Sequence, residues 1–278
     1  EVSGLVIVAV IGFFFIGRSN IDYFALPVTG ITGIISGTAL IFFAYLGFED
    51  MVNLSEETKN ARKVVPKALV VALTISTILY ILVALSAVSV VGAERLAASS
   101  APLTEVVSSV IPNASFIFSF IALFATANTV LVFMIVASRM IYGLARSNAV
   151  PRFLGTVGKR GTPYISIAVV MLLSIVILSL SGIKSIALLT DVGIFLVYIV
   201  INSSLIWLRY KQPKAKRLFK TPVNIGRFPV LAFLGLVSSV FMLFYFDPVF
   251  LLYELVVIAV GFLVYRVFKH HHRKIDKK

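Results

Sequence analysis

The sequence contains no cysteine, a single tryptophan and only 12 acidic residues among 278. The absence of cysteine excludes disulfides, thiolate metal sites and cysteine nucleophiles. Charged residues make up 13% of the chain, about half the share of roughly 25% that is typical of soluble domains. Hydrophobic residues make up 59%, and the mean hydropathy is +1.03. This composition excludes an ordinary soluble globular domain and a disordered chain.

Long apolar segments take the place of the missing charge. A helix needs about 20 apolar residues to cross a bilayer. Because the apolar runs are continuous and do not alternate with polar residues, they predict helices. Eight segments qualify, at residues 2–17, 30–54, 67–92, 114–142, 164–182, 185–208, 228–246 and 248–267. We therefore predict an all-α integral membrane protein with about eight transmembrane helices in a single domain, followed by a basic tail at residues 268–278.

The first segment begins almost at the first residue of the chain. Glu1 precedes it, without an initiating Met, a basic start or the small-residue cleavage site of a signal peptide. We therefore expect a chain whose N-terminal part is missing.

The 25 basic residues are distributed unevenly between the connections. Four stretches, at residues 54–67, 139–163, 209–227 and 266–278, hold 22 of them, and the alternate connections hold only three. The three are Arg18, Arg95 and Lys184. In a soluble protein a net charge of +13 would suggest a nucleic acid partner, but in a membrane protein basic residues mark the cytoplasmic side. We predict that the four stretches and both ends of this chain are cytoplasmic, that no nucleic acid binds, and that the histidines at 270–272 lie in a solvated tail and hold no metal.

The predicted outer connection at residues 93–113 carries one apolar helix face. Its apolar positions, at i, i+3, i+4, i+7 and i+8, are Leu103, Val106, Val107, Val110 and Ile111. Ser100 is a candidate cap, and Pro102 suits a first helical turn. Both an interfacial helix on lipid and a lid over an outward cavity fit this pattern.

The segment at residues 30–54 contains two acids, Glu49 and Asp50, after a long apolar run. An acid at the bilayer centre costs about 2.5–3.5 kcal/mol, so it should face a cavity or a broken backbone. Gly47 favours an interruption, and we expect the helix to unwind across residues 44–47. Glu49 would then lie in the first turn of a second half-helix, whose partial positive charge favours a carboxylate.

A continuous helix, with both acids near its cytoplasmic end, is the alternative. Adjacent residues point about 100° apart on a helix, so only one of the two acids can face a cavity squarely. Glu49 comes first in the chain and is therefore the deeper candidate.

Four stretches resemble the amino acid permeases of the amino acid–polyamine–organocation superfamily. FFAYLGFEDMVNLSEETKNARKVVPKAL at residues 42–69 resembles their helix 6 and the following loop, and ASRMIYGLARSNAVPRFLGTVGKRGTPYISI at residues 137–167 resembles their helix 8 and its loop. LTDVGIFLVYIVINSSLIWLRYKQP at residues 189–213 resembles helix 10, and RLFKTPVNIGRFPVL at residues 217–231 resembles the loop before helix 11. The resemblance implies helices 5–12 of a LeuT-like fold, which is built on inverted repeats with broken helices.

This resemblance also implies a substrate site at the break. In the family an aromatic residue gates the site, and main-chain carbonyls hold the substrate ammonium. The matching positions here are Phe43, Ala44, Tyr45, Leu46 and Gly47, with Phe43 as the gate. Glu49 stands where several members have an acid tied to coupling, and Asp50 is a further candidate.

Two other segments supply candidate coupling residues. Thr126 and Thr129 share a helix face in the segment at 114–142, where sodium-coupled relatives use hydroxyls; helix–helix hydrogen bonding is the alternative. Asp191, about six residues into the segment at 185–208, either lines an outer vestibule or lies at the interface. The coupling ion, proton or sodium, stays open.

Together these patterns predict a secondary active amino acid transporter of the plasma membrane that is proton-coupled and works by alternating access. An exchanger or antiporter, a sodium-coupled permease and, less readily, a channel are the alternatives. No phosphate-binding glycine motif, no HExxH and no histidine within a segment occurs, so neither an ATP-driven pump nor a membrane enzyme is expected. No cofactor is predicted; the expected partners are an amino acid, the coupling ion and the lipid bilayer.

Overall fold

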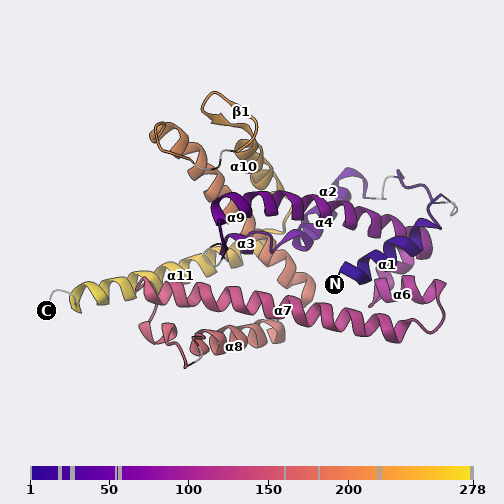
Figure 1. Cartoon of the computed structure of the whole chain (residues 1–278), viewed down its shortest axis with the longest axis horizontal. Coiled ribbons are helices and arrows are strands. Elements are labelled where there is room, and N and C mark those ends of the chain that lie inside the picture. Colours follow the sequence, from indigo (N-terminus) through magenta and orange to yellow (C-terminus); the bar gives the residue numbers. More distant parts are fainter. Residues whose placement is uncertain are drawn as a thin grey trace. The chain divides into compact units, whose positions relative to one another are not determined.

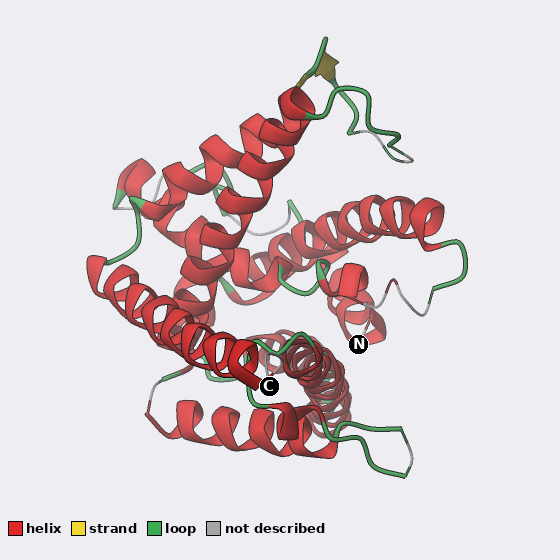
Figure 2. Ribbon diagram, turned by 90° about the vertical axis from the view of Figure 1, so that its left-hand side faces the viewer, coloured by secondary structure: helices red, strands yellow, loops and turns green. Residues whose placement is uncertain are grey.

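The computed structural model is helical almost throughout (Figures 1 and 2). It describes residues 2–17, 21–25, 29–53, 55, 58–159, 161–180, 182–217, 219 and 221–275. The α-helices are α1 (Val2–Phe13), α2 (Gly30–Ile41), α3 (Asp50–Asn53), α4 (Ala61–Val91), α5 (Ala93–Ala98), α6 (Pro102–Val110), α7 (Ser115–Arg146), α8 (Tyr164–Leu180), α9 (Ile183–Lys211), α10 (Val230–Leu243) and α11 (Pro248–Ile275). The 3-10 helices are η1 (Phe42–Tyr45) and η3 (Arg152–Gly155), and the strands are β1 (Asn224–Ile225) and β2 (Phe228–Pro229).

The helices match the predicted apolar segments in order. Within the described residues, five helices are long and apolar enough to cross a membrane. They are Gly30–Val52, Ala61–Val91, Ser115–Arg146, Ile183–Lys211 and Pro248–Phe268. Three further apolar helices, Val2–Phe13, Tyr164–Ser179 and Val230–Leu243, are shorter. The predicted helical membrane protein is confirmed, whereas the count of eight crossings and the inverted-repeat fold stay predictions.

The residues form two compact units, and the first consists of residues 1–25 and 66–133. Its core packs Val8 of α1 against Val83 of α4, Val106 and Val107 of α6, and Phe118 of α7. In this unit α1 and α4 approach each other closely: a methyl group at Gly12 would lie 2.0 Å from the Cβ atom of Ser86. Small residues let membrane helices approach this closely. The resulting van der Waals packing stabilises their association, because the hydrophobic effect does not drive helices together within lipid.

The connection between α4 and α7 belongs to this core. Val106 and Val107 of α6 are 0% and 2% exposed, and α6 contacts α1, so the apolar face predicted for this helix packs against protein. Pro102 begins α6, as expected. The prediction of Ser100 as the cap was wrong, because the N-cap is Ala101 and no side chain caps the helix.

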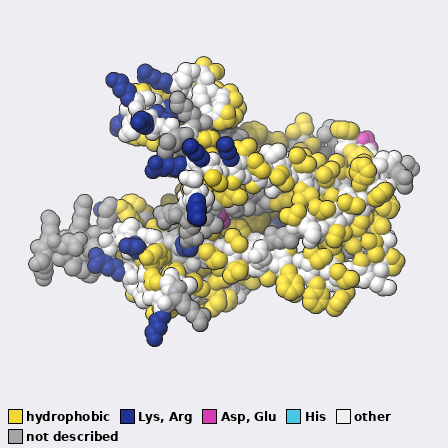
Figure 3. Space-filling view, in the orientation of Figure 1, with side chains coloured by type: hydrophobic (Ala, Val, Ile, Leu, Met, Phe, Trp, Pro, Cys, Tyr) yellow, Lys and Arg dark blue, Asp and Glu magenta, His cyan; other side chains and the backbone are white. Residues whose placement is uncertain are grey.

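The second unit consists of residues 26–65 and 134–278. Its core packs Ala39 of α2 and Phe246 around Val192 and Phe195 of α9. α9 and α10 lie side by side, and the hairpin β1–β2 joins them, turning at Gly226 with a φ of 61°. Figure 3 shows apolar side chains over much of the visible surface, with Lys and Arg on the left half of the view, some of them near the end of α9 that leads into this hairpin. This is the distribution expected of helices that face lipid and end in polar headgroups.

Candidate functional site

The predicted interruption of the second apolar segment is present in the structure. α2 ends at Ile41, and residues 42–45 continue it as the tighter 3-10 helix η1. Leu46 is then extended, with φ −68° and ψ 148°, and Gly47 has a φ of 108°. Only glycine adopts that last conformation without strain. The regular helix is therefore lost from residue 42, and the sharpest departure falls on residues 46 and 47, within the stretch expected to unwind.

Glu49 follows the break in the chain and forms a hydrogen bond with it. Its Oε2 atom accepts a hydrogen bond of 3.1 Å from the backbone N–H of Gly47, so the carboxylate satisfies a donor that the unwound backbone exposes. Glu49 lies in the turn before α3, not in its first turn as expected. α3 has four residues, and a helix of one turn has little macrodipole, so the hydrogen bond to Gly47 is the interaction that places Glu49.

One stripe of α9 covers the break. Asp191, Phe195 and Tyr198 are spaced i, i+4 and i+7, which places them on one face of the helix. The ring of Phe195 stacks against Phe42 with centroids 4.6 Å apart, and Tyr198 meets Phe42 edge-on at 6.2 Å. Tyr198 also lies 6.3 Å from the ring of Phe48. Aromatic rings therefore line the break on the side of α9. The polar groups at the two ends of the stripe are the carboxylate of Asp191 and the hydroxyl of Tyr198.

These two polar groups have no hydrogen-bond partners within the described part of the chain. Asp191 is 0% exposed, yet neither of its carboxylate oxygens makes a hydrogen bond. The backbone N–H of Phe43 approaches the carboxylate without completing one. The hydroxyl of Tyr198 is also buried and unpaired, and the carboxylate of Glu49 faces it. Unpaired buried polar groups are rare and costly, so this stripe is where the structure departs from ordinary packing.

The residues predicted as the substrate site lie along the break. The side chain of Phe43, the predicted gate, is 43% exposed, and its carbonyl accepts the backbone N–H of Leu46 at 3.2 Å. Phe42, which sequence reasoning did not single out, makes the ring contacts with α9. Sequence reasoning also missed Phe195 and Tyr198, although their spacing from Asp191 is the signal that could have found them.

Other predicted residues lie elsewhere. Asp50 begins α3, directly after Glu49. Thr126 and Thr129 belong to the first unit and donate to the carbonyls of Ala122 and Ala125 in their own helix, at 2.9 and 3.1 Å. A hydroxyl bonded in this way keeps lone pairs for a cation, so the ion-site role stays a prediction. The side chains of the histidines at 270–272 fall outside the described residues, and no metal-binding cluster occurs among those that are described.

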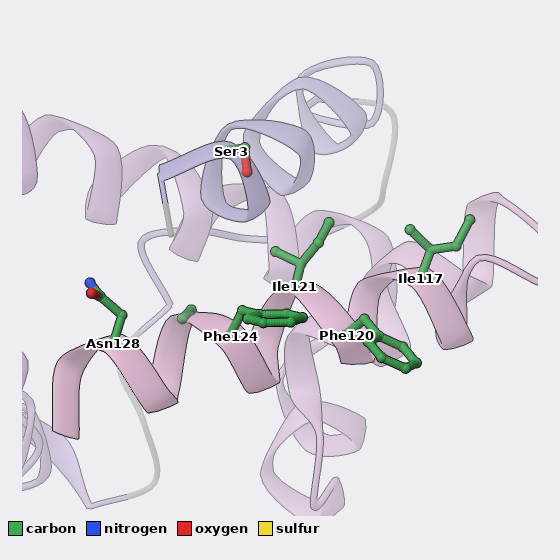
Figure 4. Close-up of a pocket in the computed structure, with 7 residues that line it drawn as sticks. Ser3, Ile117, Phe120, Ile121, Phe124 and Asn128 are labelled. Atoms are coloured by element: carbon green, nitrogen blue, oxygen red, sulfur yellow. The ribbon is translucent and has the colours of Figure 1, made fainter. Parts of the chain in front are cut away.

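A separate pocket of about 410 Å³ lies between α1 and α7 in the first unit (Figure 4). Ser3 contributes from α1 and Asn128 from α7, and the other lining residues are apolar. They are Ile117, Phe120, Ile121, Phe124 and Ala125. The pocket thus lies on the helix that carries Thr126 and Thr129, but neither threonine lines it.

Apolar helices long enough to cross a membrane, one of them broken beside a buried acid, define a multi-pass membrane protein. The sequence profile of the amino acid permease family matches residues 2–267. The chain belongs to this family, which consists of transporters and not of enzymes.

Individual relatives agree with this assignment. The branched-chain amino acid permease BcaP of Bacillus subtilis is 29% identical over 250 residues, which cover 89% of this chain and 53% of the relative. BcaP of Lactococcus lactis is 26% identical over 88% of this chain and 52% of its own length. A putative arginine/ornithine antiporter of Bacillus subtilis is 28% identical over 63% of this chain and 39% of its own length. The chain thus spans about half the length of the BcaP relatives it matches.

Proposed function

We propose that this chain forms part of a secondary active amino acid transporter of the plasma membrane, coupled to protons and working by alternating access. The observation that carries the proposal is the interrupted helix at residues 42–47, in a chain of the amino acid permease family. Interrupted helices supply backbone carbonyls and amides at membrane depth, and transporters use such groups to hold substrates and ions.

The substrate site in this proposal is the break itself. Main-chain groups of residues 43–47 hold the ammonium and carboxylate of the amino acid, and Phe43 closes over it. Phe43 suits a gate because its ring is 43% exposed, whereas that of Phe42 is packed against α9. Glu49, Asp50 and Asp191 are the candidates for proton coupling, and Thr126 and Thr129 are the candidates for a sodium site.

Uptake into proteoliposomes that hold the whole transporter, of which this chain forms part, tests this function. Branched-chain amino acids are the first substrates to try, because two relatives carry that name. We expect labelled leucine, isoleucine or valine to accumulate when the outside is made acidic, and not when only a sodium gradient is applied. Uptake equal to that of empty vesicles for every amino acid tried would refute the proposal.

Exchange is the second candidate function, favoured by the similarity to a putative arginine/ornithine antiporter. An exchanger would take up labelled substrate only when the vesicles are preloaded with an amino acid. Accumulation into empty-lumen vesicles, driven by pH alone, identifies the symporter instead.

We also propose that the basic stretches face the cytoplasm. Because the chain has no cysteine, single cysteines can report topology directly. Cysteines at Ser147 and Lys214 should react with a membrane-impermeant thiol reagent only from the cytoplasmic side, and one at Ser99 only from outside. Labelling of Ser147→Cys and Ser99→Cys from the same side would overturn this topology.

A further inference from the structure

Among the residues that the structure describes, the buried carboxylate of Asp191 forms no ion pair. It is 0% exposed and without a hydrogen-bond partner within the described residues. An ionised carboxylate in such a place is strongly disfavoured unless a cation or several donors compensate it. A neutral carboxylic acid avoids that penalty, and so does a carboxylate that has gained a bound cation.

The elements packed around Asp191 supply no cation. η1 presents the backbone N–H of Phe43, and η1, α2 and α10 contain no charged residue. On α9 itself, Lys184 is exposed and lies two turns away, about 10 Å along the axis.

Three acids of the described residues also lie against α9 or its side chains. Glu254 of α11 lies against Gly193, where its Oε1 atom would be 3.1 Å from an added methyl group. Position 193 is about 200° around the helix from Asp191, so Glu254 faces another side of α9. Glu49 and Asp50 face Tyr198, at the other end of the stripe.

Glu49 and Asp191, two of the three candidate acids, differ in their hydrogen bonding. Glu49 accepts the N–H of Gly47 and so helps to shape the break. Asp191 makes no such hydrogen bond, and its oxygens are unpaired within the described residues. Its burial follows from the packing of η1 and α2 on α9.

We propose that Asp191 carries the coupling proton, and that its protonation allows the turn at residues 42–45 to pack against α9. Release of the proton leaves an unpaired carboxylate under Phe42 and Phe43, so the turn must move away and admit water before Asp191 can ionise. Proton release and movement of the break are thereby linked. This inference rests on the proposed transport function and assigns the coupling step within it.

Transport assays with Asp191→Asn in the otherwise natural protein test the link, because asparagine keeps the shape and cannot ionise. For one proton per substrate, a pH step of one unit supports about tenfold accumulation, since each tenfold ratio is one unit of the same logarithmic scale. We expect about tenfold accumulation in the parent and a ratio near one in Asp191→Asn, with substrate exchange between preloaded vesicles retained. Glu254→Gln removes an acid of α11 that lies against α9, and this variant should accumulate substrate like the parent.

The outcomes separate the two proposals. A parent that neither exchanges nor accumulates any amino acid contradicts the transport function. A parent that transports, with an Asp191→Asn variant that still accumulates substrate in response to pH, overturns the role of Asp191. Accumulation by the parent that follows a sodium gradient and ignores pH overturns it as well.

A chemical measurement covers the case in which Asp191→Asn fails to fold or loses all transport. Dicyclohexylcarbodiimide modifies protonated carboxyls in apolar surroundings, and mass spectrometry locates the adduct without any need for transport. We expect Asp191 of the parent to be modified at neutral pH, more slowly at higher pH, and Glu49 to be modified far less. Absence of an adduct on Asp191, in protein whose other carboxyls react, would overturn the proposal.

Discussion

Buried polar side chains of the two units differ in whether they have hydrogen-bond partners. In the first unit, Ser86 donates to the carbonyl of Ala9 at 3.2 Å, and Ser89 bonds both the carbonyl of Leu85 and the hydroxyl of Tyr23, at 2.6 and 2.7 Å. In the second unit, Asp191 and the hydroxyl of Tyr198 have no partner within the described residues. Since lipid offers no hydrogen bonds, a polar group that is kept unpaired at membrane depth is a candidate for function.

This contrast is specific to the α9 stripe and is not a general looseness of the second unit. Ser166 there donates to the carbonyl of Leu154 at 2.6 Å, and Ser239 donates to that of Gly235 at 2.7 Å. Polar groups that only stabilise the fold are therefore satisfied in both units. The unpaired groups coincide with the broken helix, where movement is expected.

The largest effect is expected where α1 and α4 meet. In Gly12→Ala the new methyl group would lie 2.0 Å from the Cβ atom and 2.4 Å from the Cα atom of Ser86. Backbone must shift to admit it, so we expect a loss of about 3 kcal/mol in stability, the upper part of the range for overpacking. Thermal unfolding in detergent measures the loss. Gly143→Ala, where no atom lies within 4 Å, is the matched control and should be at least as stable as the parent, because alanine favours a helix more than glycine does.

Removing a paired and removing an unpaired buried polar group should change the stability of the protein in opposite directions. Ser86→Ala removes a satisfied hydrogen bond and should cost about 1 kcal/mol. Asp191→Leu removes an unpaired polar group of similar size and should raise stability by about 1–2 kcal/mol, while transport coupling is lost. Unfolding curves of both variants give the comparison. A destabilised Asp191→Leu that keeps coupling would remove the contrast between the two units.

The break should depend on the conformation of Gly47. Its φ of 108° lies in the region that L-residues avoid, so Gly47→Ala should cost about 1–2 kcal/mol. Because the strain falls at the break, substrate binding should weaken as well, which equilibrium binding of labelled substrate can measure. Gly37→Ala, in regular helix with open space around it, should leave substrate binding unchanged and should not lower stability, because alanine favours a helix more than glycine does.

Glu49 should contribute through its hydrogen bond more than through its charge. Glu49→Ala removes the acceptor for the N–H of Gly47 and should cost about 1 kcal/mol. Glu49→Gln keeps an amide oxygen that can accept the same bond, so its unfolding temperature should match the parent's. Equal destabilisation by both substitutions would show that the charge matters more than the bond.

The smallest effect is expected on the connection between α4 and α7, outside the apolar spans. A hydrogen bond from Ser99 lowers the pKa of Glu105 below its ordinary value of 4.5, and Arg95, paired with it at 2.8 Å, lowers it further. A depressed pKa favours the folded state above the ordinary pKa, and that contribution is lost as pH falls through the folded value. The melting-temperature difference between the parent and Glu105→Gln should therefore be constant from pH 7 to pH 5 and shrink at lower pH. An unchanged difference at lower pH would contradict the shift.

The position of the break could be predicted from the sequence for a local reason. Gly47 and the acids after it are adjacent in the chain, and both the cost of an intramembrane acid and the freedom of glycine are local properties. The sequence ranked Glu49 above Asp50 by its order in the chain, but it could not show what either acid contacts. The hydrogen bond to Gly47, and the faces that the two acids meet, depend on how the turn closes.

Composition and hydrophobic length predicted, without any structure, a helical chain that lies in a membrane, and the resemblance of four stretches predicted the permease family, because hydrophobic length and motif order are properties of the chain itself. Tertiary packing alone decided which residues meet at the break. Asp191 lies about 150 residues after Phe42 in the sequence, and no local pattern predicts that α9 will lay Asp191, Phe195 and Tyr198 along that turn. Packing among α9, η1 and α2 accompanies the complete burial of Asp191, and its lack of a hydrogen-bond partner within the described residues follows from how these elements meet and not from the residues near it in the chain.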